Sequence, residues 1–296
     1  MRCRSTRTAS PDASCSRSSK FVTALLNSGV RWVLYADLML LFGLPFFRIH
    51  GASARQAAAS PPRRIWLVCT ALGVVGLVAS IAGLVVTAAM MAGVEVTAVD
   101  RATLSMIVTE TTVGMSVVVR CAALIATIFA ALWLGKNGRR SALALVVSGA
   151  AIALASLAWS GHAAAGEGWG GALHLTSDIV HLCAAAVWVG ALASLMAMVL
   201  RDLASLNSHA TDDTYDALRR FAHTGSIVVM LIVASGAINT AMLVGASNLA
   251  QLPASLYGCC CWENWPFSLR CWHSRRRTAS ISHPPWAMPE RHPTGR

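Results

Sequence analysis

The sequence predicts an all-α membrane protein, built as a polytopic bundle of about six transmembrane helices. The chain of 296 residues is 55% hydrophobic and only 12% charged, whereas about a quarter of the residues in a soluble domain are charged. Stretches of eighteen or more residues with few charges recur along it, and each is long enough to cross a hydrocarbon core of about 30 Å as a helix. Residues 21–258 are therefore interpreted as one bundle.

Six apolar segments follow one another, separated by short connections that proline and glycine mark. The prolines Pro61 and Pro62 precede the second segment, Gly138 follows the third, and Gly161 follows the fourth. A glycine-rich run at 166–171 precedes the fifth segment. The six segments are predicted at residues 29–49, 65–92, 106–135, 141–160, 173–200 and 221–244.

Lysine and arginine residues concentrate in alternate loops. The second loop has only Arg101, and the fourth and sixth have none. Because cytoplasmic loops of membrane proteins hold the excess of these residues, the odd-numbered loops are predicted to lie in the cytoplasm and the N-terminus outside. The odd loops contain Arg55, Arg63 and Arg64, then Lys136, Arg139 and Arg140, then Arg201, Arg219 and Arg220.

The two ends of the chain carry most of its net charge of +11. Residues 1–20 and residues 259–296 contribute +4 each, so no basic patch within the bundle favours nucleic-acid binding. The Ser/Arg-rich tail 1–20 lacks the apolar region of a secretory signal. The positive charge of this tail conflicts with an N-terminus outside the cytoplasm. One interpretation is that the tail is an upstream extension from a wrongly chosen start codon. The alternative is that the charge of the tail, rather than that of the loops, sets the orientation of the protein in the membrane.

Ionisable side chains inside an apolar span are costly, by about 3 kcal/mol each, and are therefore candidate functional groups. His174, Asp178 and His181 are spaced to share one face of the fifth helix, and His162 ends the fourth. His174 and His181 lie about 10 Å apart along the axis, too far to share one ion directly. Imidazole and carboxylate ligands suit copper, zinc, iron or nickel. Spacing alone leaves open a metal site or a hydrogen-bonded cluster that joins helices.

Other polar or sulfur-containing residues are weaker candidates. Asp37 in the first helix and Arg120 in the third are opposite charges expected to pair across the bundle. Asn239 in the sixth helix is expected to form an interhelical hydrogen bond. Thioethers suit Cu(I), although methionine in a membrane helix is usually packing. Accessory ligand candidates near the outer ends of the second and third helices are Glu110, Met90, Met91 and Met115.

No sequence motif of a known catalytic site is present, so an enzyme is not expected. A b-type haem subunit is an alternative, with His181 and a histidine on a facing helix as axial ligands. His223 is the candidate partner, but it begins the sixth helix on the inner side, whereas His181 lies in the outer half of the fifth. A structural membrane protein without any ion is a further alternative.

Three stretches resemble the CopD family of bacterial inner-membrane copper resistance proteins: RWVLYADLMLLFGLPFF, GHAAAGEGWGGALHLTSDIVHLCAAAVWVGAL and LRRFAHTGSIVVMLIVASGAINT. The most specific part is HxxxDxxHxxAAxxWxG, from His174 to Gly190. The resemblance implies an eight-helix protein that moves copper from the periplasm toward the cytoplasm, alongside a periplasmic CopC-like carrier. It also implies outward-facing copper ligands at His162, His174 and His181.

The resemblance stops at Gly258, where LYGCCCWENWPFSLRCWH begins to replace the expected further helices. If the gene is read one base back, Cys260, Cys261 and Trp262 all become leucine, whichever cysteine codons are used. The shifted frame continues with Gly, Lys or Glu, Leu and Ala, as an apolar helix would. The sequence therefore predicts a frameshift after Gly258, a disordered out-of-frame tail at 259–296, and impaired function.

Overall fold

The computed structural model describes residues 11–51, 61–135, 140–161, 168–204 and 208–244, and all regular structure in these ranges is helical. The predicted all-α class is confirmed. The predicted tail 259–296 and the candidate ligand His162 lie outside the described residues. The long helices are α1 (Pro11–His50), α3 (Arg63–Ala92), α4 (Arg101–Glu110), α5 (Thr112–Phe129), α6 (Arg140–Ala155), α7 (Gly168–Ala204) and α8 (Ser208–Val244).

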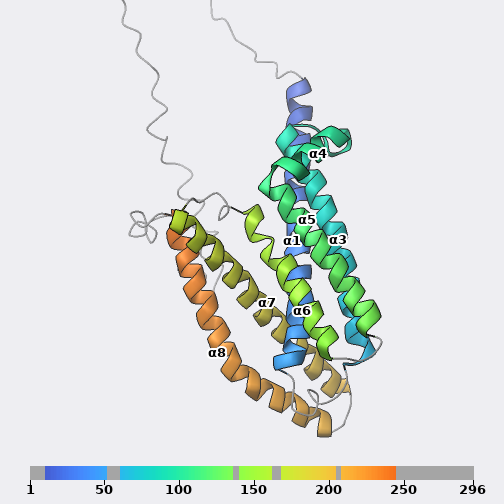
Figure 1. The fold of residues 1–296 in the computed structure, drawn as a ribbon, viewed down its shortest axis with the longest axis vertical. Helices are drawn as coiled ribbons and strands as arrows, with labels where there is room; N and C mark the ends of the chain where they lie inside the picture. The colour runs from blue at the N-terminus through green and yellow to red at the C-terminus, as the bar shows by residue number, and fades with distance from the viewer. Residues whose placement is uncertain (1–10, 52–60, 136–139, 162–167, 205–207, 245–296) are drawn as a thin grey trace, which may run out of the picture. The chain divides into compact units, whose positions relative to one another are not determined.

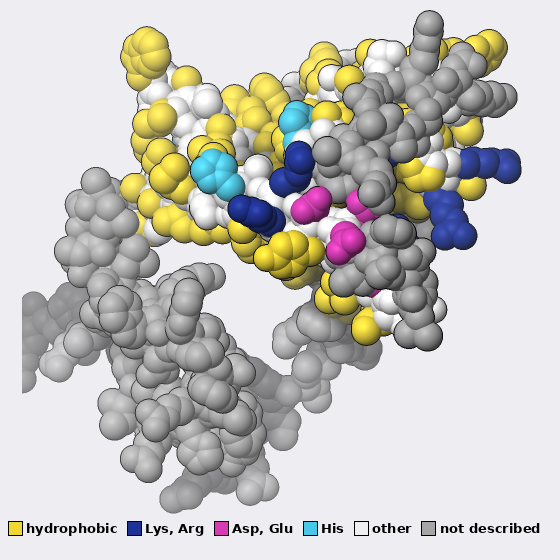
Figure 2. Space-filling view, turned by 90° about the horizontal axis from the view of Figure 1, so that it is seen from below, with side chains coloured by type: hydrophobic (Ala, Val, Ile, Leu, Met, Phe, Trp, Pro, Cys, Tyr) yellow, Lys and Arg dark blue, Asp and Glu magenta, His cyan; other side chains and the backbone are white. Residues whose placement is uncertain are grey.

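Six helical stretches are long and apolar enough to cross a membrane, as the sequence predicts. Successive spans run in opposite directions, so the ends joined by odd-numbered loops lie together at the lower end of Figure 1. Figure 2 looks onto that end and shows arginine or lysine, acidic and histidine side chains close together there. The spans are Val22–His50, Arg63–Ala92, Thr112–Leu134, Ser141–Ser160, Gly168–Ala204 and Asp212–Val244.

The third predicted segment is not one continuous helix, which corrects the prediction of 106–135. The backbone of Thr111 is extended, with φ −118° and ψ 147°, and it separates α4 from α5. The Thr111 hydroxyl accepts a hydrogen bond from the Gly114 amide at 3.0 Å and thereby caps α5. A side chain on Gly114 would meet the Ile107 carbonyl, so glycine allows α4 to fold back against α5.

The first helix is longer than predicted, because α1 begins at Pro11 and includes residues 11–20 of the predicted tail. Proline fits the first turn of a helix, because an amide hydrogen at that position would have no acceptor within the helix. The part of α1 that is apolar enough to cross a membrane begins at Val22.

Helix α1 lies at the centre of the bundle and packs against α3, α6 and α7. Leu38 and Leu41 are fully buried in the main apolar cluster, together with Leu124 of α5 and Val146 of α6. Lipid tails are as apolar as these side chains, so close van der Waals packing, rather than removal from water, must favour the folded bundle.

A close crossing joins α1 and α7 at two glycines. A Cβ atom on Gly43 would meet the Ala186 carbonyl oxygen and the Gly190 backbone, and one on Gly190 would meet the Gly43 backbone. Small residues let membrane helices approach this closely. The crossing therefore fixes where α7 lies against the central helix.

Helix α8 is more weakly embedded than the other spans. Only 11% of its most apolar window is buried, against 28–50% for the other five. A second apolar cluster holds its N-terminal half, where Phe221 packs near Phe47 of α1 and Trp188 of α7. Most of its apolar surface is thus left to lipid or to further protein.

The glycine crossing yields a stability prediction. Gly190→Ala places a methyl group inside the Gly43 backbone, and we expect it to lower the free energy of unfolding by about 1–3 kcal/mol. Thermal unfolding of the purified protein in detergent would measure the loss.

Gly29→Ala is the matched control, because no atom lies within 4 Å of its new Cβ. The control should be neutral or should stabilise the helix by about 0.5–1 kcal/mol. Equal unfolding temperatures for the two variants would contradict the close crossing.

Candidate metal site on α7

The three predicted residues of α7 are each half-buried. His174, Asp178 and His181 follow one another at four- and three-residue intervals, so they share one face of the helix. Hydrogen bonds from Asp178 and His181 lead to α8, which places these two residues on the side of α7 that meets α8.

The His181 ring is fixed by two acceptors on α8. Its Nδ1 lies 3.2 Å from the Ile232 carbonyl oxygen and 3.1 Å from Ser235 Oγ. A carbonyl can only accept, so Nδ1 must carry the proton and donate it. The Ser235 hydroxyl donates its own hydrogen to the Leu231 carbonyl at 2.5 Å, which leaves its oxygen free to accept.

This arrangement assigns the tautomer of His181 and leaves Nε2 unprotonated, with its lone pair available. Metal-binding histidines commonly use one nitrogen for the metal and donate the other N–H to a carbonyl or carboxylate. Gly236 packs beside the ring, since a Cβ there would lie in ordinary van der Waals contact with His181 Cε1 at 3.4 Å. The local geometry of His181 is therefore that of an oriented imidazole ligand.

Asp178 is held by an interhelical contact at the limit of hydrogen bonding. Asn239 Nδ2 donates to Asp178 Oδ1 at 3.5 Å, which confirms the interhelical hydrogen bond expected of Asn239. A stronger bond joins the same helices nearby, where the Ser177 hydroxyl donates to the Ser235 carbonyl at 3.0 Å. Asp178 thus keeps one carboxylate oxygen without a described hydrogen bond.

Ser177 and Ser235 are the residues that sequence reasoning missed. Ser177 precedes Asp178 and faces α8, and Ser235 accepts from His181 while its carbonyl accepts from Ser177. Their signal in the sequence was weak, because serine is common at helix contacts in membranes. Only the pairing of α7 with α8 shows that both belong to one network.

The described residues do not by themselves complete a metal site. No group of three His, Cys, Asp or Glu side chains is close enough to hold an ion in the ranges that the structure covers. His174 forms no hydrogen bond to any described residue. The sequence prediction used His162 as the further ligand, and that residue falls outside these ranges.

The accessory candidates are all exposed and lie on other helices. Met90 and Met91 end α3, Met115 begins α5, and Glu110 is the last residue of α4. Within the described chain, Glu110 forms no ion pair. Nothing in their packing marks these side chains as ligands.

The predicted ion pair between Asp37 and Arg120 is wrong for this structure. Both side chains are buried, with 4% and 3% of their surface exposed. Arg120 Nε donates to Ser156 Oγ at 2.9 Å, and neither carboxylate oxygen of Asp37 has a hydrogen-bond partner among the described residues. Serine groups that follow α6 accept from the guanidinium instead, while Asp37 packs against Gly76 of α3.

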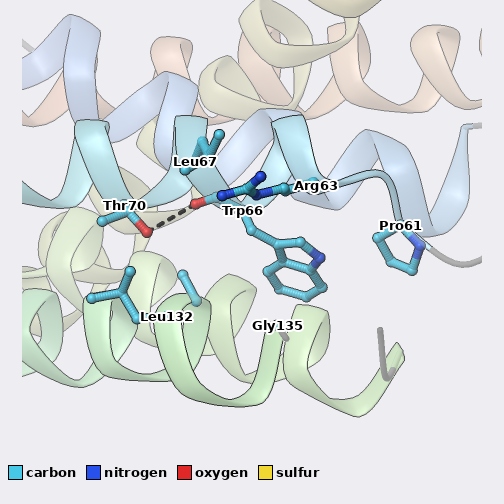
Figure 3. A pocket seen from close by; sticks show the side chains of 8 residues that line it. Pro61, Arg63, Trp66, Leu67, Thr70, Leu132 and Gly135 are labelled. Atoms are coloured by element: carbon cyan, nitrogen blue, oxygen red, sulfur yellow. Dashed lines mark hydrogen bonds between the residues drawn. The ribbon is translucent and has the colours of Figure 1, made fainter. Parts of the chain in front are cut away.

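The cavity in Figure 3 is separate from these residues. It measures about 440 Å³ and lies where α3 begins, lined by Arg63, Trp66, Leu67 and Leu132 among others. The Trp66 ring lies beside Gly135, where a Cβ would contact it. None of the candidate ligands lines this cavity.

The haem alternative gains no support from the helix pairing. His181 meets α8 at Ile232 and Ser235, whereas His223 lies nine residues earlier, about 13 Å along the axis. Two axial ligands of one haem need similar depths on facing helices. These two histidines do not provide that arrangement.

Comparison with known proteins places the chain in a family. A family profile described as "Copper resistance protein D-like, N-terminal domain" matches residues 22–172, which end just before His174. "Copper resistance protein D" of Pseudomonas syringae pv. tomato is 35% identical over 238 residues, which are 79% of this chain and 74% of that protein. No solved structure matches the chain. The chain belongs to the copper resistance protein D-like family of multi-pass membrane proteins.

Proposed function

We propose that the chain binds copper between α7 and α8 and contributes in this way to copper resistance. The observation that carries the proposal is the oriented His181 ring, whose Nδ1–H is held by Ile232 and Ser235 while Nε2 stays available. Imidazole and carboxylate are suitable ligands for copper, and Asp178 lies one turn from His181. Membership of a copper resistance family makes copper the metal of first choice.

His162 and His174 complete the proposed site. His174 and His181 are too far apart along α7 to bind the same ion directly. A single ion would therefore use Asp178 with one of the two histidines, and His162 would join the outer pair. Glu110, Met90, Met91 and Met115 remain accessory candidates that could meet copper on its way to this site.

The proposed direction is from the periplasm toward the cytoplasm across the bacterial inner membrane. The arginine-rich odd loops favour the cytoplasmic side, which puts His174 at the outer end of α7. A periplasmic CopC-like carrier is the proposed donor of copper. In this scheme copper is cargo, and no catalytic step is assigned to the chain.

A frameshift after Gly258 would leave α8 without the helices that should follow it. The low burial of α8 supports this proposal, because five other spans bury 28–50% of their apolar windows and α8 buries 11%. The chain would then bind copper but move it poorly.

Removal of both α7 histidines tests the copper site. In the double variant His174→Ala, His181→Ala, we expect copper bound per purified protein to fall by at least half, because each position loses an imidazole ligand. Metal analysis after dialysis against buffered copper measures the stoichiometry. His223→Ala is the control, since this exposed histidine is assigned no ligand role, and unchanged binding in the double variant would reject the site.

Ser235→Ala tests the orientation of His181. Loss of this acceptor should weaken copper binding by about 10–100-fold without removing a ligand, as for other groups that orient a metal-binding histidine. Competition with a copper chelator gives the affinity. Ser226→Ala removes another serine of α8, one that bonds only within its own helix, and should leave the affinity unchanged. Equal affinities for the two variants would show that Ser235 does not orient a ligand.

Restoration of the reading frame tests the truncation. A one-base correction at codon 258 should increase cellular copper accumulation over that of the present chain, because the added helices would cover α8. Copper content per cell, at matched protein levels, is the measurement. Equal accumulation by the two forms would contradict the proposed impairment, and resequencing of the gene would show which form is natural.

A further inference from the structure

A small cavity with both polar and apolar lining residues lies among the outer halves of α1, α3, α5 and the short helix η4 (Ala158–Ser160) that follows α6. Its volume is about 130 Å³, well above the space that a single water molecule requires. Two arginines line it, one from α1 and one from α5. The polar side chains around it are Asn27, Arg31, Tyr35, Ser80, Thr87, Arg120 and Ser160.

Arg120 is the most deeply buried cation on this cavity, with 3% of its surface exposed. Its Nε donates to Ser156 Oγ at 2.9 Å, and its Nη2 lies 3.4 Å from both the Ser156 carbonyl and Ser160 Oγ. The Ser160 hydroxyl lies 2.8 Å from Ser116 Oγ. All these partners are neutral, and the described residues provide none for Nη1.

No carboxylate lines the cavity. The ion pair Arg201–Asp202 lies at the end of α7 and involves neither arginine of the cavity. A buried charge without a counter-charge is costly inside a membrane protein, and such a charge usually pairs or marks an ion site. Arg31, whose side chain is exposed, adds a second positive charge beside the same cavity.

We propose that this cavity binds a small inorganic anion such as chloride. Arg120 and Arg31 supply the positive charge, and the hydroxyl groups of Tyr35 and Ser160 can donate to the same ion. Arg120 lies eight residues into α5, about 12 Å from its start, which is deeper than a lipid phosphate at the membrane surface. The bound anion neutralises Arg120 and ties α1, α3, α5 and η4 together.

The anion site does not depend on copper. None of the residues on the cavity belongs to the proposed copper site. Its loss should therefore leave copper stoichiometry unchanged, and the two proposals can fail separately.

Thermal unfolding of the purified full chain in detergent tests the site. Sodium gluconate replaces sodium chloride at constant ionic strength, so that only the anion changes. Chloride that binds the folded state should raise the unfolding temperature. When the chloride concentration is ten times the dissociation constant, the expected rise is on the order of 3 °C. Equilibrium dialysis with radioactive chloride should find one ion per protein.

Arg120→Gln should abolish both the temperature shift and the bound chloride. Arg201→Gln is the matched control, because it removes an exposed arginine that already has an acid partner, and it should retain both. If Arg120→Gln does not fold, Ser160→Ala and Arg31→Gln should each raise the chloride concentration needed for half of the shift. Equal stability in chloride and gluconate, or chloride binding that survives in Arg120→Gln, would overturn the proposal.

Discussion

The contact on which the bundle depends is the crossing of α1 and α7 at Gly43 and Gly190, where backbone meets backbone. Lipid gives membrane helices no hydrophobic reason to associate, so a close approach of this kind gains its energy from dispersion contacts alone. It sets the rotation of α7 against the central helix. The side of α7 that carries Asp178 and His181 is thereby directed to α8.

Serine side chains then satisfy most of the polar groups that this packing buries. Ser235 accepts from His181, and Ser156 accepts from Arg120. A short side chain on a neighbouring helix can reach a buried donor without the desolvation cost of a second charge. Exceptions among the described residues are both carboxylate oxygens of Asp37 and Oδ1 of Asn239, which are buried without a hydrogen-bond partner.

The sequence predicted the spans well because length and hydropathy decide them, and it predicted the α7 face because helical spacing decides which residues share a side. It failed where partners come from distant helices. Opposite charges suggested that Asp37 and Arg120 pair, but pairing depends on rotation about each helix axis, which hydropathy does not specify. The break at Thr111 was missed for a local reason, since one hydroxyl cap interrupts an otherwise apolar run.

Helix α8 connects the proposed copper site to the end of the chain. It is held at its N-terminal half by Phe221 and its neighbours and at its C-terminal half by hydrogen bonds to α7. Those polar bonds are the same ones that orient His181 and restrain Asp178. Any loss of protein packed against α8 would therefore act on the proposed ligands through Ser235 and Asn239. A frameshift after Gly258 would then impair the proposed copper binding because α8 loses the protein packed against it.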